Sequence, residues 1–154
     1  MSINYQGSHV AVATNFHQAS PILRVRDLEA SLRYFHDILG FEIDWKDPTQ
    51  FASVSRGDAN VMLCLGDQGN PPAWVWIGVG DAEALRVEYE ARGARIRMEP
   101  TNFPWAMEMH VEDLDGNVLR LGSEPVHDRP FGPWRDMNGV RWHRNGHDSW
   151  TRAD

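Results

Sequence analysis

The sequence lacks several features that mark secreted and membrane proteins. It has a single cysteine, Cys64, which excludes an intrachain disulfide. No apolar stretch is long enough to cross a bilayer. Residues 1–20 have neither the basic start nor the long apolar segment of a signal peptide. We therefore expect a cytoplasmic protein with no membrane partner.

An excess of positive charge is also missing. The 15 Lys and Arg residues are outnumbered by 22 Asp and Glu residues, and the formal net charge is −7. A diffuse negative field disfavours nucleic acid and modestly favours cationic small molecules. The seven tryptophans suit stacking and cation–π contact, although we expect most of them in a core or an interface. These features favour a small cationic or aromatic ligand and exclude a nucleic-acid partner.

Common catalytic motifs are absent as well. The sequence has no G-x-S-x-G elbow for a nucleophilic serine, no G-x-G-x-x-G and no phosphate-binding loop. Cys64 lies in the apolar run VMLCL, which indicates an inert core thiol. Nucleophilic catalysis is therefore not expected.

What the sequence does contain is a duplicated pattern. Residues 22–43 and 76–96 each begin with a short apolar strand that ends in valine, and an aspartate follows two residues later as a helix N-cap. These aspartates, Asp27 and Asp81, are 54 residues apart. Apolar residues then recur at helical spacing until Gly40 and Gly93, which are suited to end the helices. A repeat of this length indicates two copies of one structural unit.

A strand and a hairpin complete each copy. Strands are expected over 41–46 and 94–98, and the hairpins pair 50–56 with 60–65 and 107–111 with 118–121. The pattern predicts an α+β fold of two tandem βαβββ modules, which form a curled mixed sheet around a cavity. We assign residues 1–19 to an N-terminal extension, 20–68 to the first module, 69–73 to a linker, 74–124 to the second module and 125–154 to a C-terminal extension.

The run MEMHVEDLDGN (107–117) contains the densest group of candidate functional side chains. Alternation along a strand places Glu108, His110 and Glu112 on one face. Three interpretations stay open: a metal site that needs a further ligand, a solvated or partly buried polar face, and a wall that contacts a ligand. We interpret DLDGN (113–117) as a hairpin turn, because Asp, Asn and Gly accept left-handed backbone angles.

The C-terminal extension predicts a tryptophan-rich hairpin. Asn145-Gly146 is typical of a two-residue turn, which would place Trp142 opposite Ser149 and Arg141 opposite Trp150. The tryptophans must pack on the domain itself, on a partner or at the mouth of a pocket, and packing is favoured over ligand contact. Three histidines are expected on the surface: His127, His143 and His147. In the N-terminal extension, the run VAVATNF (10–16) is expected either to pair as an edge strand or to stay mobile.

The order of these segments resembles the vicinal oxygen chelate superfamily, which includes glyoxalase I, extradiol dioxygenases and bleomycin-resistance proteins. The matching segments are VRDLEASLRYFHDILGFEI, FASVSRGDANVMLCL, AWVWIGVGDAEAL and PWAMEMHVEDLDGNVLRLG, within about residues 20–124. The bleomycin-resistance branch is most similar. The resemblance implies paired βαβββ modules and, in the metal enzymes, four inward ligands from the first and last strands of each module.

The four corresponding positions hold Ser20, Met62, Trp74 and Arg120. These side chains do not suit a divalent cation, which prefers carboxylate and imidazole ligands. We therefore expect no metal and no cofactor, and loss of the usual metal-dependent reaction, which favours a protein that is not an enzyme. Whether any other catalysis remains stays open.

The favoured hypothesis is a homodimeric, bleomycin-resistance-type protein that sequesters a cationic or aromatic small molecule and confers antibiotic resistance. Metal-dependent glyoxalase or dioxygenase chemistry is the alternative, and docking of a protein partner by the tryptophan-rich tail is a third hypothesis. Pairing of the modules within one chain or between chains stays open. The candidate ligand-binding residues are Trp45, Phe51, Trp76, Trp105, Glu108 and His110.

Overall fold

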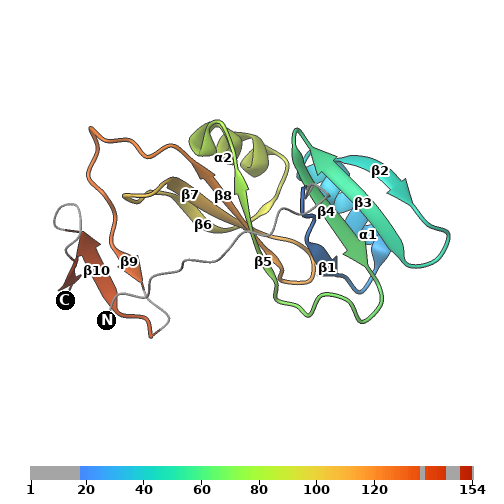
Figure 1. The fold of residues 1–154 in the computed structure, drawn as a ribbon. Helices are drawn as coiled ribbons and strands as arrows, with labels where there is room; N and C mark the ends of the chain where they lie inside the picture. Colours follow the sequence, from blue (N-terminus) through green and yellow to red (C-terminus); the bar gives the residue numbers. More distant parts are fainter. Residues whose placement is uncertain (1–17, 136–137, 145–149, 154) are drawn as a thin grey trace, which may run out of the picture.

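The computed structural model describes residues 18–135, 138–144 and 150–153. Its elements follow one another as two similar units and a tail (Figure 1). The first unit contains β1 (Ile22–Arg24), α1 (Leu28–Arg33), η1 (Tyr34–Ile38), β2 (Glu42–Lys46), β3 (Phe51–Arg56) and β4 (Ala59–Cys64). The second contains β5 (Trp74–Gly78), α2 (Ala82–Ala91), β6 (Arg95–Asn102), β7 (Met107–Glu112) and β8 (Val118–Ser123). The tail contains β9 (Trp134–Arg135), β10 (Arg141–Arg144) and β11 (Trp150–Ala153).

The two units have the same sheet topology. The strand orders are β1-β4-β3-β2 and β5-β8-β7-β6, here called the first and second sheets. In each sheet the first and last strands of the unit run parallel, and the other neighbours run antiparallel. The prediction of two tandem βαβββ modules in an α+β fold is confirmed.

The helices begin where the sequence predicts. The side chains of Asp27 and Asp81 each accept a hydrogen bond from the backbone N–H three residues later, at 2.9 Å in both cases. The first helix then widens into the π-helical turn η1 and closes at Gly40, whose φ of 73° favours glycine. Local capping therefore marks both helix starts, and at α2 the N–H of Ala82 also donates to Ser123 Oγ of β8 at 3.2 Å.

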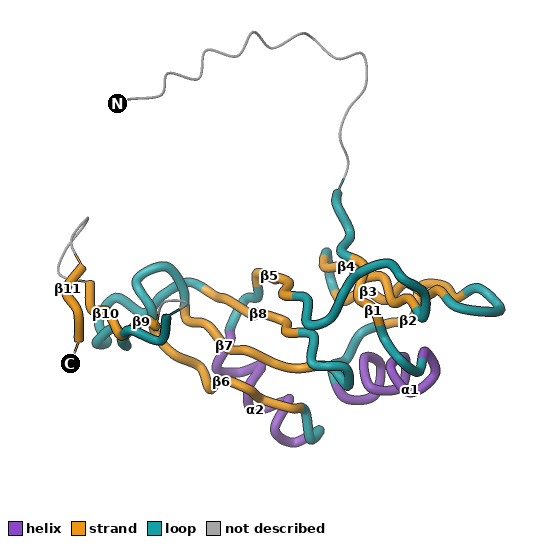
Figure 2. Tube along the Cα trace, turned by 90° about the horizontal axis from the view of Figure 1, so that it is seen from below, coloured by secondary structure: helices purple, strands orange, loops and turns teal. Residues whose placement is uncertain are grey.

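Both helices lie on the same side of the two sheets (Figure 2). The apolar residues that alternate toward them form one core shared by the modules, including Leu23, Val54, Leu63, Met109 and Leu121. We call the opposite face of each sheet its open face.

Two tyrosines join the modules. The Tyr34 hydroxyl donates to the carbonyl of Glu112 at 2.7 Å and accepts from the N–H of Arg95 at 3.0 Å. In the reverse direction, the Tyr89 hydroxyl donates to the carbonyl of Leu39 at 3.0 Å. Each module therefore holds the other through a tyrosine on its own helical segment.

The DLDGN segment is the hairpin turn between β7 and β8, as predicted. One oxygen of the buried Asp113 accepts from the backbone N–H groups of Asp115 (2.8 Å) and Asn117 (2.9 Å), and Gly116 adopts a φ of 81°. The Asn117 amide also donates to the carbonyl of Arg24 in the first module, at 3.1 Å. The turn thus has a structural role that extends to the neighbouring module.

The tail hairpin forms with a different register from the predicted one. Arg141 pairs with Ala153 and Trp142 with Arg152, so the predicted pairing of Trp142 with Ser149 and of Arg141 with Trp150 was wrong. The turn predicted at Asn145-Gly146 lies outside the described residues. The short strand β9 adds to β10 and makes the tail a three-stranded sheet. The observed register allows β10 to pair with β9 and the tail to pack against the second module, and local turn propensity does not take these contacts into account. The predicted edge strand in 1–19 falls largely outside the described residues, as does His147.

Among the described residues, no helix combines the length and apolar character that crossing a membrane requires.

Candidate functional site

The open face of the second sheet carries a polar network centred on Glu108. This carboxylate is 1% exposed and lies on β7. It accepts from Trp105 Nε1 at 3.0 Å, from Arg120 Nε and Nη2 at 2.7 and 3.0 Å, and lies 2.6 Å from His110 Nε2. We call Trp105, Glu108, His110 and Arg120 the Glu108 network.

These donors stabilise the ionised form of Glu108. Burial alone would raise the pKa of the carboxyl group, but the hydrogen bonds from His110, Arg120 and Trp105 outweigh burial and lower the pKa to about 2. Glu108 is therefore ionised and fully partnered, which leaves it poorly placed to receive a ligand cation.

Two arginine–tryptophan pairs flank this network. The Arg120 guanidinium lies 5.3 Å from the ring centroid of Trp76, and the Arg97 guanidinium lies 5.1 Å from that of Trp74. Arg97 also donates to Glu112 at 2.9 Å. Both geometries are cation–π contacts, and they align the indoles along the edge strand β5.

The E-x-H-x-E strand face does not converge on an ion. Glu108 and His110 bond to each other, whereas Glu112 turns to Arg97. Among the described residues, no group of three or more His, Cys, Asp or Glu side chains is arranged to hold a metal. Of the three interpretations, the partly buried polar face describes this geometry, and contact with a ligand stays a prediction.

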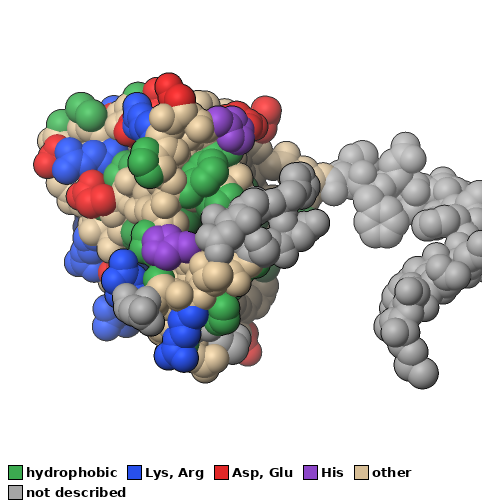
Figure 3. All heavy atoms as spheres, turned by 90° about the vertical axis from the view of Figure 1, so that its left-hand side faces the viewer, with side chains coloured by type: hydrophobic (Ala, Val, Ile, Leu, Met, Phe, Trp, Pro, Cys, Tyr) green, Lys and Arg blue, Asp and Glu red, His purple; other side chains and the backbone are tan. Residues whose placement is uncertain are grey.

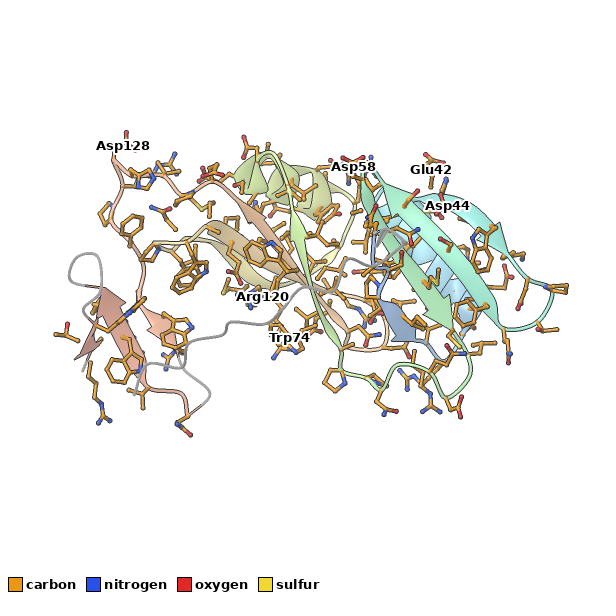
Figure 4. The ribbon with its side chains drawn as sticks, viewed as in Figure 1. Glu42, Asp44, Asp58, Trp74, Arg120 and Asp128 are labelled. Carbon is orange, nitrogen blue, oxygen red and sulfur yellow. The ribbon has the colours of Figure 1, made fainter. Side chains whose placement is uncertain are left out.

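The metal positions of the superfamily fit no divalent cation here. Arg120 carries a positive charge that would repel the ion, and its guanidinium is committed to Glu108. In the parallel strand pair of the second module, Trp76 of β5 lies opposite Arg120 of β8. In that of the first module, Ile22 of β1 lies opposite Met62 of β4. Ser20 precedes β1 in the sequence. Trp74, labelled in Figure 4, is the first residue of β5. None of these side chains supplies a carboxylate or imidazole ligand.

The close approach of Trp76 to β8 depends on Gly122. A Cβ atom added at Gly122 would lie 2.2 Å from the Trp76 ring. We predict that Gly122→Ala displaces the indole, breaks its contact with Arg120 and costs about 1 kcal/mol of stability through overpacking. The measurement is the Trp76 indole N–H resonance together with urea denaturation.

Gly78 is the matched control, because it pairs with Gly122 and an added Cβ would meet nothing within 4 Å. Gly78→Ala should leave the Trp76 resonance in place. An unmoved resonance in Gly122→Ala would contradict the packing described above.

The open face of the first sheet carries a second aromatic pair. The rings of Trp45 and Phe51 are nearly parallel, with 6.1 Å between centroids and 15° between planes. Asp44 beside them accepts from Ser53 at 2.9 Å, from Ser55 at 2.6 Å and from Asn60 at 3.2 Å. We call Asp44, Ser53, Ser55 and Asn60 the Asp44 cluster.

A hollow lies where the first and second sheets adjoin, beside the start of β4 and along β5. Its volume is about 270 Å³, and it is lined by Asn60 of the Asp44 cluster and by Trp76 of the second sheet, together with Gln18, Pro21 and Asp58. A separate cavity of about 570 Å³ lies between the modules beside α2, where Arg56 pairs with Glu88 at 2.9 Å. Of these two cavities, the smaller is lined by both Asn60 and Trp76, whose side chains lie on the open faces.

The six predicted ligand-binding residues fall into two groups. Trp45 and Phe51 lie on the first sheet, and the other four, Trp76, Trp105, Glu108 and His110, belong to or adjoin the second. The sequence analysis missed Asp44 and Arg97 as residues of these faces and treated Trp74 and Arg120 only as failed metal ligands. Alternation along β5 and β8 could have placed Trp74, Trp76 and Arg120 together.

The tail packs on the second module through tryptophan. Trp105 stacks on Phe103 at 4.9 Å and contacts Trp134 and Trp150 at 6.2 and 6.1 Å between centroids. Figure 3 shows hydrophobic side chains exposed at this end of the molecule, among charged ones. Trp105 thereby joins the tail to the Glu108 network, and packing on the domain's own surface is confirmed for Trp134 and Trp150. His127 and His143 are exposed, as predicted.

The glyoxalase/bleomycin resistance protein/dioxygenase superfamily matches residues 9–121. The chain belongs to this superfamily, and the resemblance seen in the sequence is confirmed. The match ends before the tail.

Solved structures share this fold. A bleomycin-binding protein from Streptomyces verticillus, in complex with copper(II)-bleomycin, is 28% identical with a TM-score of 0.58, covering 71% of this chain and 98% of that chain. An antibiotic-binding protein from Streptomyces sp. CB03234 is 21% identical, with a TM-score of 0.62 and coverage of 73% and 99%. A lactoylglutathione lyase from Agrobacterium tumefaciens is 16% identical, with a TM-score of 0.60 and coverage of 71% and 96%.

An uncharacterized protein from Mycolicibacterium smegmatis is also similar. It is 28% identical over 100 residues, which cover 64% of this chain and 85% of that protein.

Proposed function

We propose that this protein binds a small cationic or aromatic molecule on the open faces of its sheets, as a bleomycin-resistance-type binding protein. The observation that carries the proposal is the exposure of tryptophan on both faces. Trp45, Trp74 and Trp76 are 46%, 48% and 50% exposed although they lie on strands of the sheets. Large exposed aromatic surfaces beside polar groups are typical of binding sites.

The proposed binding needs no bound metal. Arg120 and Trp74 occupy positions that the metal enzymes of the superfamily give to ligands, and the Glu108 carboxylate is already engaged by Arg120. Stacking on indole and charge complementarity supply the binding energy instead. The likeness to the bleomycin-binding protein supports this class of ligand.

We further propose a homodimer. In one chain the two sheets lie side by side (Figure 1), and about half of the surface of Trp45, Trp74 and Trp76 stays exposed. A second copy that placed its own open faces over these would bury the indoles and enclose the ligand from both sides. Such an isologous interface is the commonest arrangement in homodimers.

Titration calorimetry with metal-free and copper(II)-loaded bleomycin tests the proposal, with light scattering to report the mass in solution. We expect saturable binding to a two-chain assembly. Trp76→Ala should weaken binding by about tenfold, which is about 1.4 kcal/mol of lost stacking. The matched control is Trp134→Ala, which removes a tail indole outside both open faces and should leave the affinity within about twofold.

If the wild-type protein binds neither form of bleomycin, bleomycin is excluded as its ligand. An equal loss in the Trp76 and Trp134 variants would contradict the open faces as the site.

A further inference from the structure

The carboxylates on the two open faces differ in their partners. On the second sheet, Glu108 pairs with Arg120 and Glu112 pairs with Arg97, so each negative charge is offset by a cation. On the first sheet, Asp44 accepts hydrogen bonds only from neutral groups, two hydroxyls and one amide. Within the part of the chain that the structure describes, no Lys, Arg or His lies within ion-pair distance of Asp44. Its charge is therefore held in place and not neutralised.

A β-bulge gives Asp44 this position. The register of β2 against β3 shifts between Ile43 and Trp45, so Asp44 is the extra residue of the bulge. Trp45 lies opposite Ser53 on the open face, and the bulge lets its neighbour Asp44 reach Ser53 and Ser55 on that same face. A regular strand would send consecutive side chains to opposite faces.

The second module has a bulge at the corresponding place. The register of β6 shifts between Ile96 and Met98, around Arg97. Asp44 and Arg97 are 53 residues apart, the same spacing as Gly40 and Gly93 at the helix ends. The repeated bulge thus holds an acid in the first module and a base in the second. Arg97 is neutralised by Glu112, so only the first bulge presents a net charge.

The surroundings of Asp44 suit a cation attached to an aromatic system. The Trp45–Phe51 pair lies beside the carboxylate, and Asn60, which donates to it at 3.2 Å, also lines the hollow that reaches Trp76. A molecule seated in this hollow would meet Trp76 on one side and Asn60 on the other, and Asn60 connects the hollow to the Asp44 carboxylate. Carboxylate and indole faces both attract organic cations.

We propose that Asp44 is the anionic anchor of a subsite for a protonated or quaternary nitrogen, and that the ring system attached to this nitrogen lies toward Trp76. This inference rests on the proposed function and names the charged group of its ligand. It moves the cation-binding role from Glu108, which is paired with Arg120, to a carboxylate that has no cationic partner and is held by three neutral donors. Figure 4 shows Asp44 on β2, away from Arg120 and Trp74 on the second sheet.

The test compares two probes of nearly equal shape, N-methylquinolinium and neutral 2-methylquinoline, titrated at pH 8 with tryptophan fluorescence and calorimetry as readouts. Wild-type protein should bind the cation about five to ten times more tightly than the neutral probe. Asp44→Asn keeps the size of the side chain and removes its charge, with one acceptor oxygen replaced by an amide donor that the Ser53 and Ser55 hydroxyls can accept from. This variant should bind the two probes equally. The matched control, Asp128→Asn, makes the same charge change on an exposed tail residue that lies far from Asp44 in Figure 4, and it should keep the preference.

The outcomes separate the two proposals. If wild-type protein binds neither probe, the aromatic faces are not a site for such molecules, and the proposed function fails together with the subsite. If wild-type protein binds both probes equally, or if Asp44→Asn keeps the preference for the cation, the role of Asp44 is refuted and the binding function stands. Circular dichroism of each variant reports that the fold is intact.

Discussion

Replacing Glu108 with leucine should lower the free energy of unfolding by about 3 kcal/mol, the lower end of the cost of breaking a buried ion pair. The substitution leaves the donors of Trp105, His110 and Arg120 without their acceptor. The cost stays at the lower end because Arg120 is 38% exposed and can turn toward water. Urea denaturation followed by circular dichroism measures the change.

Glu112→Leu is the matched control on the same strand. Glu112 also pairs with an arginine, but its side chain is 31% exposed. An ion pair of this kind contributes at most about 1 kcal/mol. Equal losses in the Glu108 and Glu112 variants would contradict the central role of Glu108.

The effect of Glu108 should also depend on pH. Its folded-state pKa is about 2, below the ordinary value of 4.5, so the unfolded chain binds more protons between these values. The stabilisation is therefore complete above about pH 4.5 and is lost as the pH falls toward 2, by about 3 kcal/mol in all. Stability curves of wild type and Glu108→Leu should converge over this range, and a constant difference would contradict the lowered pKa.

Asp113 acts in the opposite direction in both proteins. Burial raises the pKa of this carboxyl group, so its contribution weakens as the pH rises. Because both proteins contain Asp113, it cancels from the comparison.

Tyr89→Ala should produce the second large loss, about 3–5 kcal/mol, because it leaves a cavity where the two modules meet. Tyr89 is fully buried, and burial raises the pKa of its hydroxyl to about 12. Its hydroxyl donates to the carbonyl of Leu39 in the other module. Urea denaturation of each variant is the measurement.

Tyr89→Phe keeps the ring and removes only the hydroxyl. We expect it to cost about 1 kcal/mol, the usual net value of one hydrogen bond. If the alanine and phenylalanine variants lost the same amount, packing of the ring would not be what joins the modules.

Much of the fold could be read from local patterns. Asp27 and Asp81 mark helix starts because an N-cap is satisfied by neighbours three residues away. DLDGN marks a hairpin because Asp113 organises its own turn. The tail hairpin was predicted with the wrong register, since local turn propensity takes no account of the pairing of β10 with β9 or of packing on the second module.

The candidate site was harder to predict, because its partners are distant in sequence. Glu108 meets Arg120 across a strand pair, and Trp105 meets Trp134 and Trp150 of the tail. The position of Asp44 depends on a bulge that the alternation of residues 41–46 does not reveal. Sequence identified aromatic and acidic candidates, but it did not indicate which carboxylates have cationic partners.

By itself, the amino-acid sequence determined the duplication, the order of strands and helices in each copy, and the unsuitability of Ser20, Met62, Trp74 and Arg120 as metal ligands. Those properties depend on residue type and on contacts within a few positions along the chain. The tertiary structure decided the distribution of charge over the open faces, where Glu108 is neutralised and Asp44 is not. Ion pairing depends on distances of a few ångströms between residues far apart in sequence, and only the packed sheets fix those distances.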